Sequence, residues 1–132
     1  MLDAGGLRCA WTDRPLSRET LDIDHMFPWA EWPCGDLWNL LPAHRIVNQH
    51  LKRDRLPSAV ALFRAEDRII GWWRLAYLDK TERRLPDQFL QEARASLPAF
   101  PTTAPGDIFA SVSLQRIRLR DDQQVPEWEG AS

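Results

Sequence analysis

The chain has 132 residues, of which 44% are hydrophobic and 27% charged, and this composition is that of a single globular domain rather than a disordered chain. No apolar run reaches the roughly 18 residues of a membrane span, and no signal peptide is recognisable at the start, so a cytoplasmic protein is expected. The net charge of −2 excludes a globally basic nucleic-acid binder, but residues 45–84 carry ten Lys or Arg against five Asp or Glu and are the expected contact for a polyanion.

The first part of the chain predicts a hairpin, a loop and a helix. Residues 7–12 read as a short strand, 13–16 as a turn and 21–26 as the returning strand. Two prolines and a glycine then predict a loop, with a brief helical turn at residues 36–41. Residues 43–55, which follow this loop, contain neither Pro nor Gly and predict a helix that ends before Leu56.

The second part predicts helices. Ser58 is a suitable N-cap for a helix over residues 59–78, and a further helix is expected over 86–96. A Pro-rich linker covers 97–107, and residues 108–120 fit either a helix or a strand, with the helix favoured. Cys9 and Cys34 are too few for a disulfide scaffold. Five of the seven tryptophans, at positions 29, 32, 38, 72 and 73, are expected to pack in the core or between parts of the domain, with stacking on nucleic-acid bases as the alternative.

One segment of the first part is unusual for a small globular protein. In "LDIDHMFPWAEW", from Leu21 to Trp32, an apolar strand pattern carries Asp22, Asp24 and His25. A carboxylate beside an imidazole on a rigid strand is costly unless it is hydrogen-bonded, binds a metal or is catalytic. By itself such a pair is more often a structural hydrogen bond than a site.

The wider string "DIDHMFPW…DLWNLLPAHRIVNQHLKRDRLP" resembles the HNH, or ββα-metal, endonuclease family. That family's signature is an acid and a histidine on a strand, a middle asparagine, and a final His or Asn on a helix. Here Asn39 follows His25 by fourteen residues and Asn48 follows Asn39 by nine, which is the usual spacing. The resemblance implies an α+β fold: a ββα-metal hairpin–helix unit in residues 1–58, on which helices of residues 59–132 pack as part of one structural domain.

The resemblance also implies roles for individual residues. Asp24 and Asn48 would offer oxygen ligands to a divalent cation, Mg²⁺ or else Mn²⁺. His25 would be the general base, since an unperturbed imidazole titrates near pH 6.5, about where it can take a proton from water. Asn39 completes the catalytic set and is expected to brace the loop rather than touch substrate. The cleaved strand would carry 5′-phosphate and 3′-hydroxyl ends.

Further residues are assigned around this set. Lys52 lies one helical turn beyond Asn48, and with Arg53 and Arg55 it is expected to bind nucleic-acid phosphates, although this basic run also fits a solvated helix end. Asp22 shares a strand face with Asp24 and is either a support for the metal ligands or a solvated acid.

A structural zinc ion is not expected. Many relatives hold zinc with two C-x-x-C pairs, and the four corresponding positions here are Cys9, Thr12, His44 and Val47. Two of these four side chains are not zinc ligands.

The expected function is therefore metal-dependent hydrolysis of DNA, with duplex DNA as the expected partner and no membrane. Because the chain starts close to the first expected strand, we expect it to be the catalytic part of a larger protein with an N-terminal regulatory or DNA-binding module. Two alternatives stay open: a catalytically idle ββα module that binds nucleic acid or a protein partner, and a nuclease directed at RNA.

Overall fold

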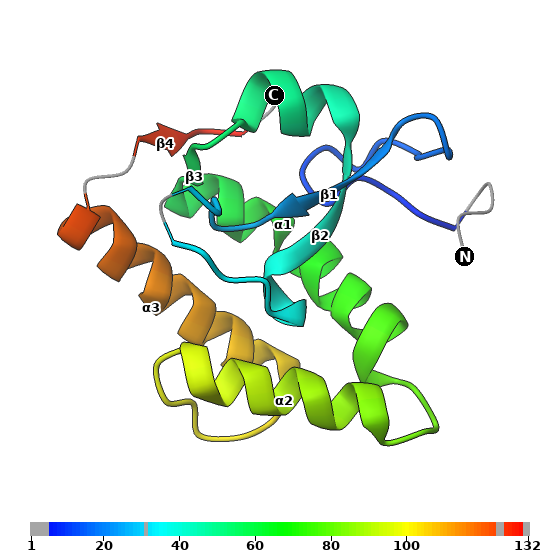
Figure 1. Ribbon diagram of the computed structural model, residues 1–132, viewed down its shortest axis with the longest axis vertical. Coiled ribbons are helices and arrows are strands. Elements are labelled where there is room, and N and C mark those ends of the chain that lie inside the picture. The colour runs from blue at the N-terminus through cyan, green and yellow to red at the C-terminus, as the bar shows by residue number, and fades with distance from the viewer. Residues whose placement is uncertain (1–5, 31, 124–125, 131–132) are drawn as a thin grey trace.

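A two-stranded antiparallel hairpin followed by a short helix positions the candidate site. The computed structural model describes residues 6–30, 32–123 and 126–130. Strand β1 (Leu21–His25) pairs with β2 (Leu40–His44). The loop between them ends in the 3-10 turn η1 (Leu37–Asn39), and β2 leads into η2 (Val47–Lys52), the turquoise-to-green helix at the top of Figure 1. These elements form the ββα unit of an α+β fold, which confirms the predicted fold class.

The predicted pairing of β1 with residues 7–12 is wrong. Those residues form a tight turn in which the Cys9 amide donates to the carbonyl of Arg14, at 2.9 Å. Only an isolated bridge between Arg8 and Pro15 has strand-like pairing there. A turn that closes on itself leaves no extended edge for β1, so the hairpin partner comes from the other side of the loop.

Strand β2 is not predicted from the sequence, because Pro42 lies in its centre. Proline has no amide hydrogen and normally argues against a strand. Here Pro42 stands opposite Ile23 in an edge strand, and its carbonyl accepts a hydrogen bond from the Ala10 amide at 2.9 Å. Since β2 takes residues 40–44, the helix predicted over 43–55 is shorter than expected and ends at Lys52.

The predicted helices of the second part are confirmed. The Ser58 hydroxyl caps α1 (Ala59–Trp73) by accepting a hydrogen bond from the Ala61 amide at 3.1 Å, and the segment 108–120 is helical. The elements after η2 are β3 (Leu56–Pro57), α1 (Ala59–Trp73), η3 (Arg74–Leu78), α2 (Arg84–Ser96), α3 (Pro105–Gln123) and β4 (Glu127–Trp128). β3 and β4 pair in parallel and join distant parts of the chain, a contact without any local sequence signal.

One buried cluster contains residues from both parts of the chain. Trp73 on α1 packs edge-on against Phe89 of α2, with ring centroids 5.3 Å apart, and its indole donates to the Trp38 carbonyl at 3.1 Å. The second part therefore supports the loop that follows β1. Among the described residues, no helix combines the length and apolar character needed to cross a bilayer.

The turn after η2 holds an arginine in a backbone conformation that favours glycine. Arg53 has φ 52° and ψ −129°, and the Arg55 amide donates to the Lys52 carbonyl at 3.0 Å across it. This is the first central position of a type II′ turn. We expect Arg53→Gly to raise the free energy of unfolding by about 1 kcal/mol, because glycine removes the steric cost.

Urea titration of Arg53→Gly beside Asp54→Gly tests this expectation. Asp54 is the next residue of the same turn and is not among the residues with positive φ, so glycine there gains nothing. Equal destabilisation by the two substitutions would contradict the assigned turn.

Candidate functional site

Two polar pairs connect β1 to η2. Strand alternation places Asp22 and Asp24 on one face of β1, and Asn48 and Lys52 lie four residues apart on η2. Asn48 Nδ2 donates to Asp22 Oδ2 at 3.3 Å, and Lys52 Nζ lies 3.4 Å from Asp24. The structure thus brings the predicted strand acids and the predicted helix asparagine to one interface.

The Asp22–Asn48 pair is partly accessible to solvent, and we call it the open pair. Both side chains are half-buried, and Asp22 Oδ2 also accepts a hydrogen bond from Gln49 Nε2 at 2.8 Å. Within the described chain, no hydrogen bond is made to Oδ1 of Asp22 or to Oδ1 of Asn48. Two oxygen atoms therefore remain for a ligand. The contact of Gln49 has no signal in the sequence.

The Asp24–Lys52 pair is buried, and we call it the closed pair. The two side chains are 3% and 0% exposed, and Lys52 Nζ is 3.4 Å from each oxygen of Asp24. The indole nitrogen of Trp11 donates to Asp24 Oδ2 at 2.7 Å, and Lys52 Nζ also donates to the carbonyl of His25 at 2.9 Å. The Lys52 ammonium lies 5.7 Å from the centroid of the Trp11 ring as well. Trp11 is thus a contact of the site that sequence reasoning missed.

Burial acts on both members of the closed pair. It raises the pKa of Asp24 and lowers the pKa of Lys52, because each charged form has lost its water. Their mutual attraction opposes both shifts. Each group therefore depends on its partner to remain charged, and the pair cannot be separated cheaply.

The expected phosphate contact of Lys52 does not fit this geometry. Its ammonium group is fully buried and engaged by Asp24 and by a backbone carbonyl, so it presents no charge to a bound strand. The sequence does not predict the burial of Lys52, because a lysine side chain is almost never fully buried unless it is paired. Arg53 and Arg55, in contrast, are exposed.

His25 lies at the end of β1, where the strand enters the loop. Its side chain is half-buried, and its ring centroid is 5.6 Å from that of Trp29. Trp29 is 54% exposed, so the expectation that it belongs to the core is wrong. An exposed indole beside the imidazole makes this end of the hairpin accessible from solvent and offers a flat apolar face to a ligand.

Asn39 holds the loop between the strands from inside. Its side chain is fully buried and spans the loop with three hydrogen bonds. Oδ1 accepts from the Phe27 amide at 2.9 Å, while Nδ2 donates to the carbonyls of Phe27 at 3.3 Å and Cys34 at 2.9 Å. All these partners are backbone groups. This geometry matches a bracing residue next to His25 and leaves Asn39 no path to substrate.

We expect Asn39→Ala to lower the free energy of unfolding by about 2–4 kcal/mol, because it leaves buried backbone groups of the loop unpaired. Asn48→Ala is the matched control and should cost less than about 1 kcal/mol, since it removes one partly exposed hydrogen bond. Chemical denaturation measures both. Similar losses for the two variants would contradict the bracing role.

The four positions that correspond to zinc ligands in relatives have other contacts. Cys9 and Val47 are buried, and Thr12 is half-buried in the tight turn. His44 Nδ1 accepts a hydrogen bond from the Ile46 amide at 3.2 Å. Within the described ranges, no group of three or more His, Cys, Asp or Glu side chains is arranged to hold a metal ion.

Comparison with known families identifies the unit that carries this geometry. The family model described as HNH endonuclease matches residues 9–58, the segment that contains the tight turn, β1, β2 and η2. Comparisons with curated proteins and with solved structures each found no significant match. Residues 9–58 are thus similar to the HNH endonuclease family, and the match supports membership of that family for this segment.

Proposed function

We propose that the protein is a metal-dependent endonuclease that hydrolyses phosphodiester bonds of DNA, with duplex DNA as substrate and His25 as general base. The match of residues 9–58 to the HNH endonuclease family supports a nuclease acting on nucleic acid. The observation that carries the finer proposal is the half-buried His25 at the end of β1, the strand whose Asp22 contacts Asn48 of η2. The proposed place of action is the cytoplasm.

In this proposal His25 takes the proton from the attacking water. The Lys52 ammonium fixes the backbone of His25 through its carbonyl, and Asn39 fixes the loop that follows, since the Met26 amide donates to the Asn39 carbonyl at 2.7 Å. Rigid support on both sides holds the imidazole in place, and among the described residues no hydrogen bond is made to its ring nitrogens. A general base needs such positioning before its proton affinity matters.

A divalent cation fits the open pair better than the closed one. Carboxylate and carboxamide oxygens are the ligands that Mg²⁺ prefers, and Asp22 and Asn48 each keep an oxygen without a protein partner among the described residues. Asp24, the ligand expected from the sequence, is already neutralised by Lys52, whose ammonium lies where a cation would approach its carboxylate. When bound, Mg²⁺ or Mn²⁺ would stabilise the negative charge that develops on the phosphate and the departing oxygen. We therefore propose Asp22 and Asn48 as the cation ligands, and Asp24 as a ligand only in an arrangement in which Lys52 has left it.

Calorimetric titration with Mn²⁺ separates the two carboxylates. Asp22→Asn should weaken binding at least tenfold, whereas the double variant Asp24→Asn/Lys52→Met, which removes the buried charges together, should bind like the wild type. Loss of binding in the double variant with normal binding in Asp22→Asn would return the ligand role to Asp24.

Substrate class is tested by incubating the protein and Mg²⁺ with labelled duplex DNA, single-stranded DNA and RNA of one sequence. The proposal predicts cleavage of the duplex with 5′-phosphate and 3′-hydroxyl ends. Cleavage of RNA alone would replace DNA by RNA as the substrate. Binding of all three without any cleavage in Mg²⁺ or Mn²⁺ would indicate an idle binding module and overturn the proposal.

A further inference from the structure

A groove lined by three arginines borders η2. Its lining comprises Arg14, Arg64 and Arg68 together with Trp11, Val47 and Leu51. Its volume is about 440 Å³, within the range of about 300–1,000 Å³ that is usual for ligand pockets. No acidic side chain of the described chain lines it. We call this hollow the arginine groove.

The charge in the arginine groove is not balanced by the protein. The side chains of Arg14 and Arg64 make no hydrogen bond or ion pair among the described residues, and both residues are exposed. Guanidinium groups gathered at one hollow repel one another unless an anion lies between them. The arrangement therefore favours a bound anion, and phosphate oxygens match the fork of a guanidinium group.

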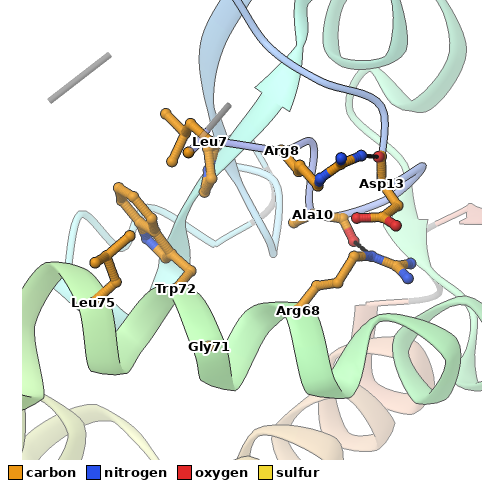
Figure 2. A pocket seen from close by; sticks show the side chains of 10 residues that line it. Leu7, Arg8, Ala10, Asp13, Arg68, Gly71, Trp72 and Leu75 are labelled. Carbon is orange, nitrogen blue, oxygen red and sulfur yellow. Dashed lines mark hydrogen bonds between the residues drawn. The ribbon is translucent and has the colours of Figure 1, made fainter. Parts of the chain in front are cut away.

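Arg68 gives the groove a fixed wall. Its Nε donates to the carbonyl of Ala10 at 2.7 Å and its Nη2 to the carbonyl of Trp11 at 3.3 Å, which ties α1 to the tight turn. Figure 2 shows Arg68 and its bond to Ala10 from a second, neighbouring pocket, which Asp13 also lines. Asp13, the acid of this turn, lines that pocket together with Arg68 and is not among the residues that line the arginine groove.

The groove adjoins the candidate site through two shared elements. Trp11 is one of the residues that line the groove, and it donates its indole hydrogen to Asp24. On η2, Val47 and Leu51 border the groove, whereas the residues that follow each of them, Asn48 and Lys52, contact β1. A polyanion that lies across η2 can therefore reach both surfaces. Among polyanions, a nucleic-acid strand fits this continuity better than an acidic protein segment.

We propose that the arginine groove binds backbone phosphates of the nucleic-acid strand beside the cleaved bond, with Arg14 and Arg64 as the phosphate contacts. This inference rests on the proposed nuclease function for the identity of the anion. Leu51, which is 43% exposed, supplies apolar contact for the sugars between phosphates. Arg64 and Arg68 lie outside residues 9–58, so the helical part of the chain contributes to substrate binding. The role first expected of Lys52 passes to these arginines.

The test measures binding of fluorescein-labelled duplex DNA by anisotropy, with EDTA present so that metal-dependent cleavage does not occur. Arg14→Gln/Arg64→Gln is compared with the wild type and with Arg84→Gln/Arg94→Gln, which removes the same charge from exposed residues of α2. α2 lies at the opposite end of the molecule from η2 in Figure 1. Titrations at several salt concentrations, from about 50 to 200 mM, give the slope of log affinity against log salt.

The groove variant should bind at least tenfold more weakly near 0.1 M salt, with a slope smaller by about one to two units, since each phosphate contact contributes about 0.9. The α2 variant should match the wild type in both quantities. The proposal is overturned if the groove variant binds DNA as tightly as the wild type, or if the α2 variant loses as much affinity as the groove variant. It is also overturned if the protein does not bind the duplex but binds a polyglutamate peptide through the same arginines.

A parallel cleavage assay of the wild type in Mg²⁺ and Mn²⁺ keeps the two proposals distinct. Cleavage by the wild type together with unchanged binding of the groove variant would reject the groove alone. Groove-dependent binding without any cleavage would reject the nuclease function and leave the groove as a nucleic-acid contact.

Discussion

His25→Ala is expected to reduce metal-dependent DNA cleavage by about 10²–10⁴-fold, because it removes the group that accepts a proton from the attacking water. The fold and the affinity for DNA should remain, since Lys52 donates its hydrogen bond to the backbone carbonyl of this residue, which alanine keeps. Initial rates on a labelled duplex, with circular dichroism and anisotropy on the same preparation, measure all three.

His50→Ala provides the matched control for this experiment. His50 is exposed on η2, two residues beyond Asn48, so removing its imidazole should leave the cleavage rate within about twofold of the wild type. Activity of His25→Ala within threefold of the wild type, or an equal loss in His50→Ala, would remove His25 from the role of base.

Lys52→Met is expected to lower the free energy of unfolding by about 3–5 kcal/mol, because it leaves the carboxylate of Asp24 buried without its counter-charge. This is a large part of the stability of a small domain, which is about 5–15 kcal/mol. Arg55→Met, in the exposed turn after η2, should change stability by no more than about 0.5 kcal/mol. Urea unfolding followed by tryptophan fluorescence compares the variants.

The double variant Asp24→Asn/Lys52→Met should recover at least half of the loss. Asparagine keeps an oxygen that accepts the indole hydrogen of Trp11, and no unpaired charge stays buried. A double variant that is less stable than Lys52→Met would contradict the ion pair as the source of the effect. If the Lys52→Met protein were as stable as the wild type, this would contradict the burial of the Asp24–Lys52 ion pair.

Strand β1, the start of α1 and the resemblance to the family could be predicted from the sequence, because their signals are local or are carried by spacing. Alternation marks β1, the cap residue Ser58 marks the start of α1, and the interval from His25 to Asn48 points to the family. The structure then brings a strand acid and Asn48 within hydrogen-bond distance. Such signals survive because each depends on a few neighbouring residues or on one fixed interval.

The remaining features depend on contacts between residues far apart in the chain. Pro42 hides β2, because its tolerance in the strand depends on an edge position that only the folded sheet defines. The burial of Lys52 depends on Asp24, twenty-eight residues earlier, and on Trp11 beyond it. The choice between Asp22 and Asp24 as a cation ligand follows from that burial. The alternation of the strand does not distinguish the two acids, so it could not predict which of them binds the cation.

Relaxation of supercoiled plasmid tests the central claim of metal-dependent nuclease action most directly. Wild-type protein and His25→Ala are incubated with the plasmid, first in EDTA and then after addition of excess Mg²⁺ or Mn²⁺. We predict no relaxation in EDTA, conversion to open-circular or linear DNA by the wild type once metal is added, and almost none by His25→Ala. Equal relaxation in EDTA, or none with either metal, would contradict the account.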